Sequence, residues 1–301
     1  MTIKIICGHD IFIENAIALS IRYKWTFEKQ FKPVINTIYI VFGGHILFNM
    51  LLESQKRLLN RIHYILLNSE QSNSIYLNET NYIQLMKQNI VLDFSLKGTY
   101  YLKEVYKIYS PTLYWFDFIP CEPNEIRAYD IAFVGSIHPY RVKLLHEIEL
   151  MFPHLNIIYD FNWKYSNPNT LTQLLKNTKV VLNIPFYKNN ALETHRIHKA
   201  LSCGCDVISM PSSDVTTNRM YEDYIYIGMN LKSLIQQYFN HELSSKKSYT
   251  VLMQHLYSQY NKPFLTIVNK THSILNSDYK PKYKTDNTLV LKRIRKVNIF
   301  N

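Results

Sequence analysis

The chain has 301 residues, of which 47% are hydrophobic and 14% aromatic, so it can bury a large core and is long enough for two domains. Its 7 glycines are too few for glycine-rich phosphate-binding loops, and no apolar run approaches the roughly 18 residues of a membrane-spanning helix. The N-terminal apolar run, MTIKIIC, is too short for a signal peptide, and we therefore expect a cytoplasmic protein.

The first half of the chain alternates continuous apolar strands with helical patterns. Strands are expected at residues 2–7, 34–42, 62–68 and 89–95, and helices at 11–23, 44–61, 75–88 and about 97–109. Apolar strands separated by helices indicate a parallel sheet that is covered on both faces.

A segment with two prolines and mixed charges, residues 116–130, interrupts this alternation, and we place a linker there. The alternation then restarts, with strands expected at 130–135, 155–161, 179–185, 205–210 and 224–228, and with helices up to 151, near 170–178, from about 190, from 230 and over about 246–275. The predicted fold class is α/β, with two Rossmann-like domains that face a cleft. In open α/β sheets, ligands bind beyond the carboxyl ends of the strands.

The cysteines are too few and too scattered for a disulfide framework or a cysteine-rich zinc site. They are Cys7, Cys121, Cys203 and Cys205. Cys203 and Cys205 flank a single glycine, and no second cysteine pair could complete a metal site. We therefore expect reduced thiols and no metal.

The net charge of +11 suggests nucleic-acid binding, but its distribution argues against a specific nucleic-acid partner. Residues 277–301 hold seven Lys/Arg and two Asp, so this basic tail alone carries +5. The remaining chain is mildly basic, as is typical of a protein that binds phosphorylated small molecules. The tail segment LVLKRIRKVNIF can contact an anionic lipid or an acidic glycan, or it can remain solvated and flexible.

The segment LETHRIHKALSCGCDVIS, residues 192–209, places a carboxylate and a guanidinium three positions apart where a helix is expected to start. Asn190 and Glu193 have the spacing of a capping box, so the helix is expected to begin near Asn190. In one interpretation, Glu193 accepts hydrogen bonds from ligand hydroxyls while Arg196 neutralises a phosphate or orients Glu193. In the other, the pair is a cap with a surface ion pair worth a few tenths of a kcal/mol.

This part of the sequence resembles the donor-binding half of GT-B-fold glycosyltransferases, and within them a group found in bacteria and large DNA viruses. The resemblance consists of a Leu-Asn-Ile strand, a Leu-Glu…Arg-Ile helix, and a small residue and a glycine before the next strand. Here these are Leu182, Asn183, Ile184, Leu192, Glu193, Arg196, Ile197, Ser202 and Gly204.

Three further segments are similar to the same family. DIAFVGSIHPYRVKLL, residues 130–145, resembles the first strand and loop of the donor-binding domain, with Gly135, Ser136 and Arg141 at matching places. HYILLNSEQ and NIVLDFSLKGTYYLK, at 63–71 and 89–103, resemble the N-terminal half.

The resemblance implies a GT-B architecture, in which one domain binds the acceptor and the other binds the nucleotide sugar. Residues 1–118 would form the acceptor-side domain and 128–255 the nucleotide-sugar domain, followed by a closing helix at 256–276 that crosses back and the basic tail at 277–301. The implied reaction moves a sugar from a nucleoside diphosphate sugar to a hydroxyl of a glycan, protein or lipid acceptor, without a cofactor. No Asp-x-Asp triplet occurs, which fits metal-independent chemistry.

The residues implied to bind the donor are Gly135, Ser136, Arg141, Asn183, Glu193, Arg196 and Lys199. The cationic ones would stabilise the diphosphate leaving group. Before the family is considered, Arg141 fits equally well as a solvated arginine in the first turn of a helix. Lys199 stands where retaining members commonly carry an acidic residue, so either Glu193 would contact the donor sugar or ribose instead, or the donor would bind differently.

In the first domain, Cys7-Gly8-His9-Asp10 ends the first strand. His9 can act as a general base for an acceptor hydroxyl, with Asp10 orienting it or capping the next helix, or His9 can be a polar loop residue only. His45 follows the second strand in a similar way, and Glu70, beyond the third strand, is expected to face the acceptor.

Two rival functions use the same fold. A nucleotide-sugar epimerase would differ from a transferase in its nucleophile, water in place of an acceptor. A binding protein that has lost turnover would fit the lysine at position 199 and would not hydrolyse the donor.

Overall fold

The chain folds into two compact units, Met1–Trp115 with His255–Asn301, and Phe116–Gln254. The structure is a computed structural model that describes residues 2–32, 34, 37–49, 63–78, 80–113, 116–162, 164–187 and 189–276. The predicted basic tail at 277–301 and the part of the predicted second helix beyond Asn49 lie outside the described residues. Within the described residues, no helix is both long enough and apolar enough to span a membrane.

The first unit contains a five-stranded parallel sheet in the order β2-β1-β3-β4-β5. Its elements are β1 (Thr2–Cys7), η1 (Asp10–Phe12), α1 (Ile13–Tyr23), β2 (Thr26–Glu28), β3 (Thr37–Phe42), α2 (Gly44–Asn49), β4 (His63–Asn68), η2 (Ile75–Asn78), α4 (Thr80–Gln88), β5 (Ile90–Asp93) and α5 (Leu96–Tyr106). Strand β3 is buried along its whole length, which is why it reads as a continuous apolar run.

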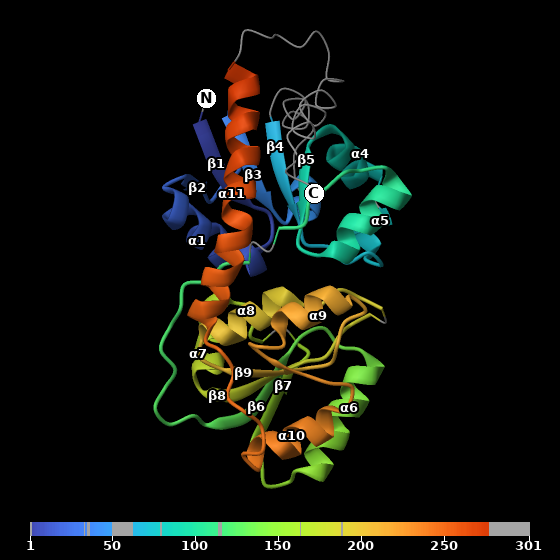
Figure 1. The fold of residues 1–301 in the computed structure, drawn as a ribbon, viewed down its shortest axis with the longest axis vertical. Helices are drawn as coiled ribbons and strands as arrows, with labels where there is room; N and C mark the ends of the chain where they lie inside the picture. The colour runs from blue at the N-terminus through green and yellow to red at the C-terminus, as the bar shows by residue number, and fades with distance from the viewer. Residues whose placement is uncertain are drawn as a thin grey trace. The chain divides into compact units, whose positions relative to one another are not determined.

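The long C-terminal helix α11 (Tyr249–Asn276) begins in the second unit, and from His255 onward it belongs to the first unit. The hydroxyl of Tyr23 donates a hydrogen bond to Asn261 Oδ1, and the Arg22 guanidinium lies 3.6 Å from the centre of the Tyr257 ring. Because these contacts join α1 to α11, the last helix packs against the first one (Figure 1). The predicted return of the C-terminal helix to the first unit is confirmed.

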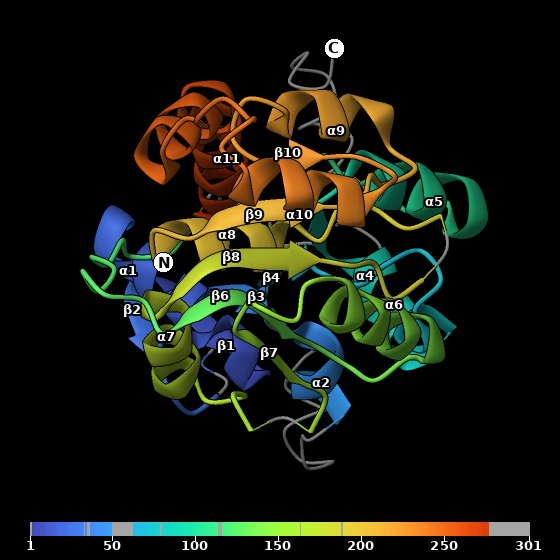
Figure 2. The same ribbon diagram turned by 90° about the horizontal axis from the view of Figure 1, so that it is seen from below.

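The second unit contains another five-stranded parallel sheet, in the order β10-β9-β8-β6-β7. Its elements are β6 (Tyr129–Val134), α6 (Pro139–Met151), β7 (Ile157–Asp160), α7 (Pro168–Lys176), β8 (Thr178–Asn183), α8 (Thr194–Ser202), β9 (Asp206–Ser209), α9 (Val215–Tyr221), β10 (Tyr226–Ile227) and α10 (Leu231–Phe239). Helices α6 and α10 cover one face of this sheet, and α7, α8 and α9 cover the other (Figures 1 and 2).

Both sheets have the same strand order when the strands are numbered along each unit: the second strand, then the first, third, fourth and fifth. In such a sheet the chain leaves the first strand toward one edge and returns to build the other edge. The helices that follow the first and third strands therefore lie on opposite faces, and open α/β sheets bind their ligands at the carboxyl ends of these two strands. This point lies between β1 and β3 in the first unit and between β6 and β8 in the second.

The predicted α/β class with two Rossmann-like units is confirmed, whereas the cleft between the two units stays a prediction. The expected start of helix α8 is wrong. The helix begins at Thr194 rather than near Asn190, and Glu193 occupies the N-cap position without a side-chain cap hydrogen bond. The carboxylate of Glu193 cannot serve the helix end because two arginines and a loop amide engage it.

A neutral histidine links helix α8 to the segment that leads into the second unit. His198 is fully buried, with Nδ1 against the carbonyl oxygen of Phe116 and Nε2 2.7 Å from the hydroxyl of Tyr221. The carbonyl can only accept, so Nδ1 carries the hydrogen and Nε2 accepts from the tyrosine. Burial lowers the pKa of His198 to about 4, because charging the ring there would require desolvating the imidazolium.

We expect this histidine to make the protein less stable in mild acid. The unfolded chain takes up a proton on His198 below pH about 6.5, whereas the folded chain does so only near pH 4. This contribution to stability is therefore complete above pH about 6.5 and is lost as the pH falls toward 4, by about 3 kcal/mol in total. Melting temperatures measured across this range should fall more steeply for the parent than for His198→Gln. The exposed-histidine control His146→Gln should keep the parent slope, and equal slopes in all three proteins would contradict the assignment.

Candidate functional site

In the second unit, the loops that follow β6 and β8 contact an arginine that is almost inaccessible to solvent. Arg141 is the third residue of α6, whose N-terminus is fixed by Pro139 and by the side chain of His138, which accepts a hydrogen bond from the Tyr140 amide. Only 1% of Arg141 is exposed. A buried guanidinium is strongly destabilising unless its donors are satisfied.

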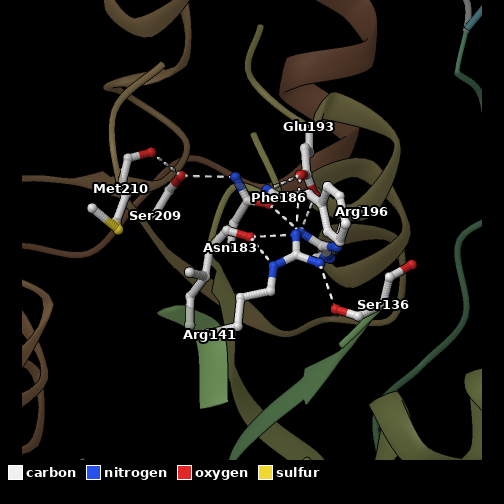
Figure 3. A network of polar contacts seen from close by, with 9 residues as sticks. Ser136, Arg141, Asn183, Phe186, Glu193, Arg196, Ser209 and Met210 are labelled. Atoms are coloured by element: carbon white, nitrogen blue, oxygen red, sulfur yellow. Dashed lines mark hydrogen bonds and ion pairs between the residues drawn. The ribbon is translucent and has the colours of Figure 1, made fainter. Parts of the chain in front are cut away.

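The hydrogen bonds of Arg141 go mainly to backbone carbonyls at the ends of two neighbouring strands. Its Nε and Nη2 atoms donate to the carbonyl of Ile184, at 3.0 and 2.6 Å, and Nη1 donates to the carbonyl of Ser136 at 3.0 Å. The same Nη2 also donates to Glu193 Oε1 at 3.2 Å. Arg141 therefore ties the loops after β6 and β8 together and holds one oxygen of Glu193 (Figure 3).

Two aromatic rings enclose this guanidinium. Its central carbon lies 5.2 Å from the centres of both the Phe133 and Phe186 rings, distances typical of cation–π contacts. Burial and the nearby charge of Arg196, opposed by Glu193, lower the pKa of Arg141 to about 10. Arg141 therefore stays charged at neutral pH, and its charge is committed to the protein itself.

Glu193 is the carboxylate that connects the two arginines. Its Oε1 accepts from Arg141 and from the backbone amide of Phe186, the latter at 3.1 Å. Its Oε2 accepts from Nη1 of Arg196 in a close ion pair. The Glu193 side chain is 18% exposed, so it is fixed in place but not sealed from solvent.

Arg196, on the first turns of α8, is the accessible cation of the site. Its Nη1 also donates to Asn183 Oδ1 at 2.8 Å, and the Asn183 amide in turn donates to Ser209 Oγ at 2.9 Å. The Arg196 side chain is 19% exposed, in contrast to the 2% of Arg141. An anion that approaches the site would therefore meet Arg196 and not Arg141.

A glycine lets the end of β6 approach both arginines. A Cβ atom added at Gly135 would lie 2.9 Å from Nη2 of Arg196 and 3.3 Å from Nη1 of Arg141. Any side chain there would displace the guanidinium groups from their present positions. Glycine at this position therefore leaves room for the two guanidinium groups where they now lie.

The local charge favours an anionic ligand. Two guanidinium groups face one carboxylate, which leaves the cluster formed by Arg141, Glu193 and Arg196 with a net positive charge. The N-terminus of α8 lies at the same place, and backbone amides at a helix start favour negative charge. An arginine held in a fixed orientation can bind an oxyanion through two hydrogen bonds.

Six of the seven residues predicted to bind a donor come together here: Gly135, Ser136, Arg141, Asn183, Glu193 and Arg196. Lys199 does not join them. It is 5% exposed, its ammonium donates to Thr172 Oγ1 on α7 at 2.7 Å, and it lies 5.3 Å from the Phe118 ring. Its position one turn further along α8 directs it into the packing between helices.

The predicted catalytic residues lie in the first unit, directly after β1. His9 caps the short helix η1, where its Nδ1 accepts a hydrogen bond from the Ile11 amide at 3.2 Å. Asp10 is the first residue of that helix. Burial lowers the pKa of His9, and the carboxylate of Asp10 opposes the shift. Their catalytic roles stay predictions.

Three contributors to the second-unit site were not anticipated from the sequence: Phe133, Phe186 and Ser209. Ser209 could have been predicted from its position, because it ends β9 as Asn183 ends β8, and the two residues are paired in register. The two phenylalanines could not have been predicted, because a phenylalanine beside a buried guanidinium and one in an ordinary hydrophobic core have the same sequence pattern.

Two buried polar atoms close in sequence to the ion pair of Glu193 and Arg196 have no hydrogen-bond partner. They are Nδ2 of Asn190, which is 2% exposed, and Oγ1 of Thr194, the first residue of α8, which is 1% exposed. Leaving such atoms unpaired is unfavourable. In the described part of the chain, no group of three or more His, Cys, Asp and Glu side chains is arranged to hold a metal ion.

Comparison with protein families and with curated proteins finds no match for this chain. Among solved structures it is similar to TarM, with 14% identity and a TM-score of 0.44 over 95% of this chain and 58% of TarM. It is also similar to a mutant of S. aureus TarM in complex with fondaparinux, α-GlcNAc-glycerol and UDP, with 14% identity and a TM-score of 0.45 over 95% of this chain and 59% of that one.

A third similar structure is WaaG, a glycosyltransferase involved in lipopolysaccharide biosynthesis, with 8% identity and a TM-score of 0.37 over 98% of this chain and 99% of WaaG. The chain spans less than two thirds of the two TarM structures that it matches.

The two arginines should differ in their importance for stability. Removing the buried one, in Arg141→Met, takes the side-chain donor away from two strand-end carbonyls and removes one of the three donors to Glu193. We expect a loss of about 3–5 kcal/mol in the free energy of unfolding. Removing the accessible one, in Arg196→Met, should cost about 1 kcal/mol. Urea unfolding of both variants measures the difference, and equal losses would show that Arg141 does not organise the site.

Proposed function

We propose that the protein is a glycosyltransferase that transfers a sugar from a nucleoside diphosphate sugar to a hydroxyl acceptor without a metal ion. The observation that carries this proposal is the pair of Glu193 and Arg196, held in a fixed orientation by the buried Arg141 at the carboxyl ends of strands in a parallel sheet. The resemblance of residues 180–209 to GT-B donor-binding domains suggests that this pair binds a nucleotide-sugar donor.

Arg196 is proposed to bind the diphosphate of the donor. When the bond between the sugar and the diphosphate breaks, negative charge grows on the departing phosphate oxygen. A preorganised guanidinium and the amides at the start of α8 would stabilise that charge, in the role that a metal ion has in other transferases. Because Arg141 and Asn183 already fix the pair, little rearrangement is needed when the charge develops.

Glu193 is proposed to accept hydrogen bonds from hydroxyls of the ribose or the sugar. The unpaired atoms of Asn190 and Thr194 lie in the loop before α8 and in its first turn, close in sequence to Glu193. Polar groups of a bound nucleotide sugar could form the hydrogen bonds that these two atoms lack. Lys199 has no part in this proposal because its ammonium is buried and bonded to Thr172. The acceptor is proposed to bind to the first unit.

Binding of pyrophosphate and of nucleotides tests the donor site. Isothermal titration with inorganic pyrophosphate, UDP, GDP, ADP and CDP should identify at least one nucleoside diphosphate that binds the parent, and the variant Arg196→Met should weaken its binding and that of pyrophosphate at least about tenfold. The matched control is Arg219→Met, which removes an exposed arginine of α9 in the same unit. Absence of binding to the parent, or equal binding by both variants, would contradict the proposal.

Turnover separates a transferase from a binding protein that kept the fold. The sugar derivative of the nucleotide that binds is then incubated with methyl glycosides in the presence of EDTA, and release of the nucleoside diphosphate is measured. We expect release that depends on the acceptor and is insensitive to EDTA. Tight binding without release would favour the impaired binding protein instead.

A further inference from the structure

The carboxyl ends of the strands in the first unit carry a second set of polar residues, which differ from those of the proposed donor site. His9, His45 and Glu70 follow β1, β3 and β4, three neighbouring strands whose carboxyl ends meet at one edge of the sheet. Gly43, with a φ of +61°, turns the chain after β3, and a Cβ atom there would lie 2.9 Å from the Cβ of His9. This close approach brings the two histidines together.

His45 is in contact with the carboxylate of Glu70. Its Nε2 lies 3.2 Å from Glu70 Oε1, and the other carboxylate oxygen, Oε2, accepts a hydrogen bond from Ser74 Oγ at 2.6 Å. A carboxylate oxygen can only accept, so Nε2 of the neutral imidazole carries the hydrogen. The remaining lone pair of the ring is therefore on Nδ1.

That Nδ1 atom is buried and has no hydrogen-bond partner. The His45 side chain is 3% exposed. An unpaired acceptor in this position is unfavourable, and such an atom in a folded protein calls for an explanation, for instance a catalytic role. A ligand hydroxyl would provide the missing donor.

His9 has the opposite arrangement. Its Nδ1 already accepts a hydrogen bond from the Ile11 amide, so in the neutral ring the hydrogen is on Nε2. His9 can therefore donate a hydrogen bond to a ligand, but it has no lone pair left for a proton. The geometry separates the two histidines into a donor and an acceptor.

We propose that His45 is the general base that accepts the proton of the acceptor hydroxyl and that Glu70 is its positioning residue. This inference rests on the proposed function, and it replaces His9 as the predicted base. A carboxylate that orients one ring nitrogen while the other takes a hydroxyl proton is the general arrangement of base-assisted transfer.

The step is balanced without a further reactant. The hydroxyl oxygen forms a bond to the anomeric carbon of the donor sugar, and its proton moves to Nδ1 of His45. The bond between the anomeric carbon and the diphosphate breaks, and its electron pair leaves with the phosphate oxygen. The imidazolium that forms is stabilised by the Glu70 carboxylate.

The surroundings of His45 keep its ring neutral before the reaction. Burial and, to a smaller extent, the charge of the neighbouring His9 together lower the pKa of His45 to about 4. The other titratable groups that face the ring are Glu70, Tyr76 and Tyr82; the tyrosine rings lie 4.5 and 5.8 Å from it. The lone pair on Nδ1 is therefore available throughout the neutral range.

The kinetic test uses the conservative variant His45→Asn, which keeps a polar group near Nδ1 but cannot take a proton. We expect kcat for transfer to fall about 100-fold or more while KM for the acceptor and donor binding change little. In Glu70→Gln, kcat should fall and its pH profile should change in the acid range. His146→Asn, on the exposed face of α6, is the matched control and should behave as the parent. A larger loss in His9→Asn than in His45→Asn would assign the base to His9 and overturn the proposal.

A measurement without turnover keeps the proposal falsifiable if no acceptor in the panel reacts. Nitrogen NMR of histidine-labelled protein should show His45 neutral from pH 5 to 8, with hydrogen on Nε2, and Glu70→Gln should change this signal. Methyl glycosides should shift the Nδ1 resonance. A hydrogen on Nδ1, or no response to any glycoside, would overturn the inference. Donor binding measured in the same samples separates this failure from failure of the proposed function, because the donor residues all belong to the second unit.

Discussion

The second unit depends on how the buried charge of Arg141 is accommodated. Transferring a guanidinium into a protein interior costs several kcal/mol, and the cost is offset only if its donors find partners of good geometry. Here the partners are the carbonyls of Ser136 and Ile184 and one oxygen of Glu193. Because these groups follow two adjacent strands, satisfying one charge also fixes both loops and the carboxylate that orients Arg196. The hydrogen bonds that offset the burial of Arg141 therefore also hold the side chains of the site in place.

The two sheets share a strand order but carry different polar residues at the carboxyl ends of their strands. In the second unit, charged side chains are paired in a way that leaves one cation accessible, which suits an anionic ligand. In the first unit, burial holds His45 neutral beside Glu70, which suits transfer of a proton. Elsewhere at the same edge of the first sheet, Asp93 is fully buried under α5, and burial raises its pKa to about 7 although Asn68 and Ser95 donate hydrogen bonds to it. A common topology thus places polar groups at one edge, and local burial decides their protonation.

Strands were predictable from the sequence where they are buried on both faces, as in β3, because their apolar residues are continuous. The strand β2, Thr26–Glu28, and the helix α9 were missed: the first is a three-residue edge strand and the second carries a mostly polar sequence. The grouping of six of the seven predicted site residues in the second unit followed from the resemblance of its segments to GT-B glycosyltransferases, whereas the spacing of Glu193 and Arg196 alone fitted a cap with a surface ion pair equally. Lys199 could not be placed correctly, since its direction depends on the packing of α8 against α7, which no local pattern encodes.

Hydrogen-bond partners that are distant in sequence determine which ring nitrogen of a histidine carries the hydrogen, and the sequence alone does not show this. His9 and His45 both follow a glycine and an apolar strand, and as sequence they are equivalent. One backbone amide, from Ile11, occupies the lone pair of the first ring, and one carboxylate, from Glu70, fixes the hydrogen of the second. Since Glu70 comes from the next strand, its contact with His45 exists only once β3 and β4 are paired in register. The capacity to accept a proton therefore arises from the register of the sheet, and it is absent from either segment alone.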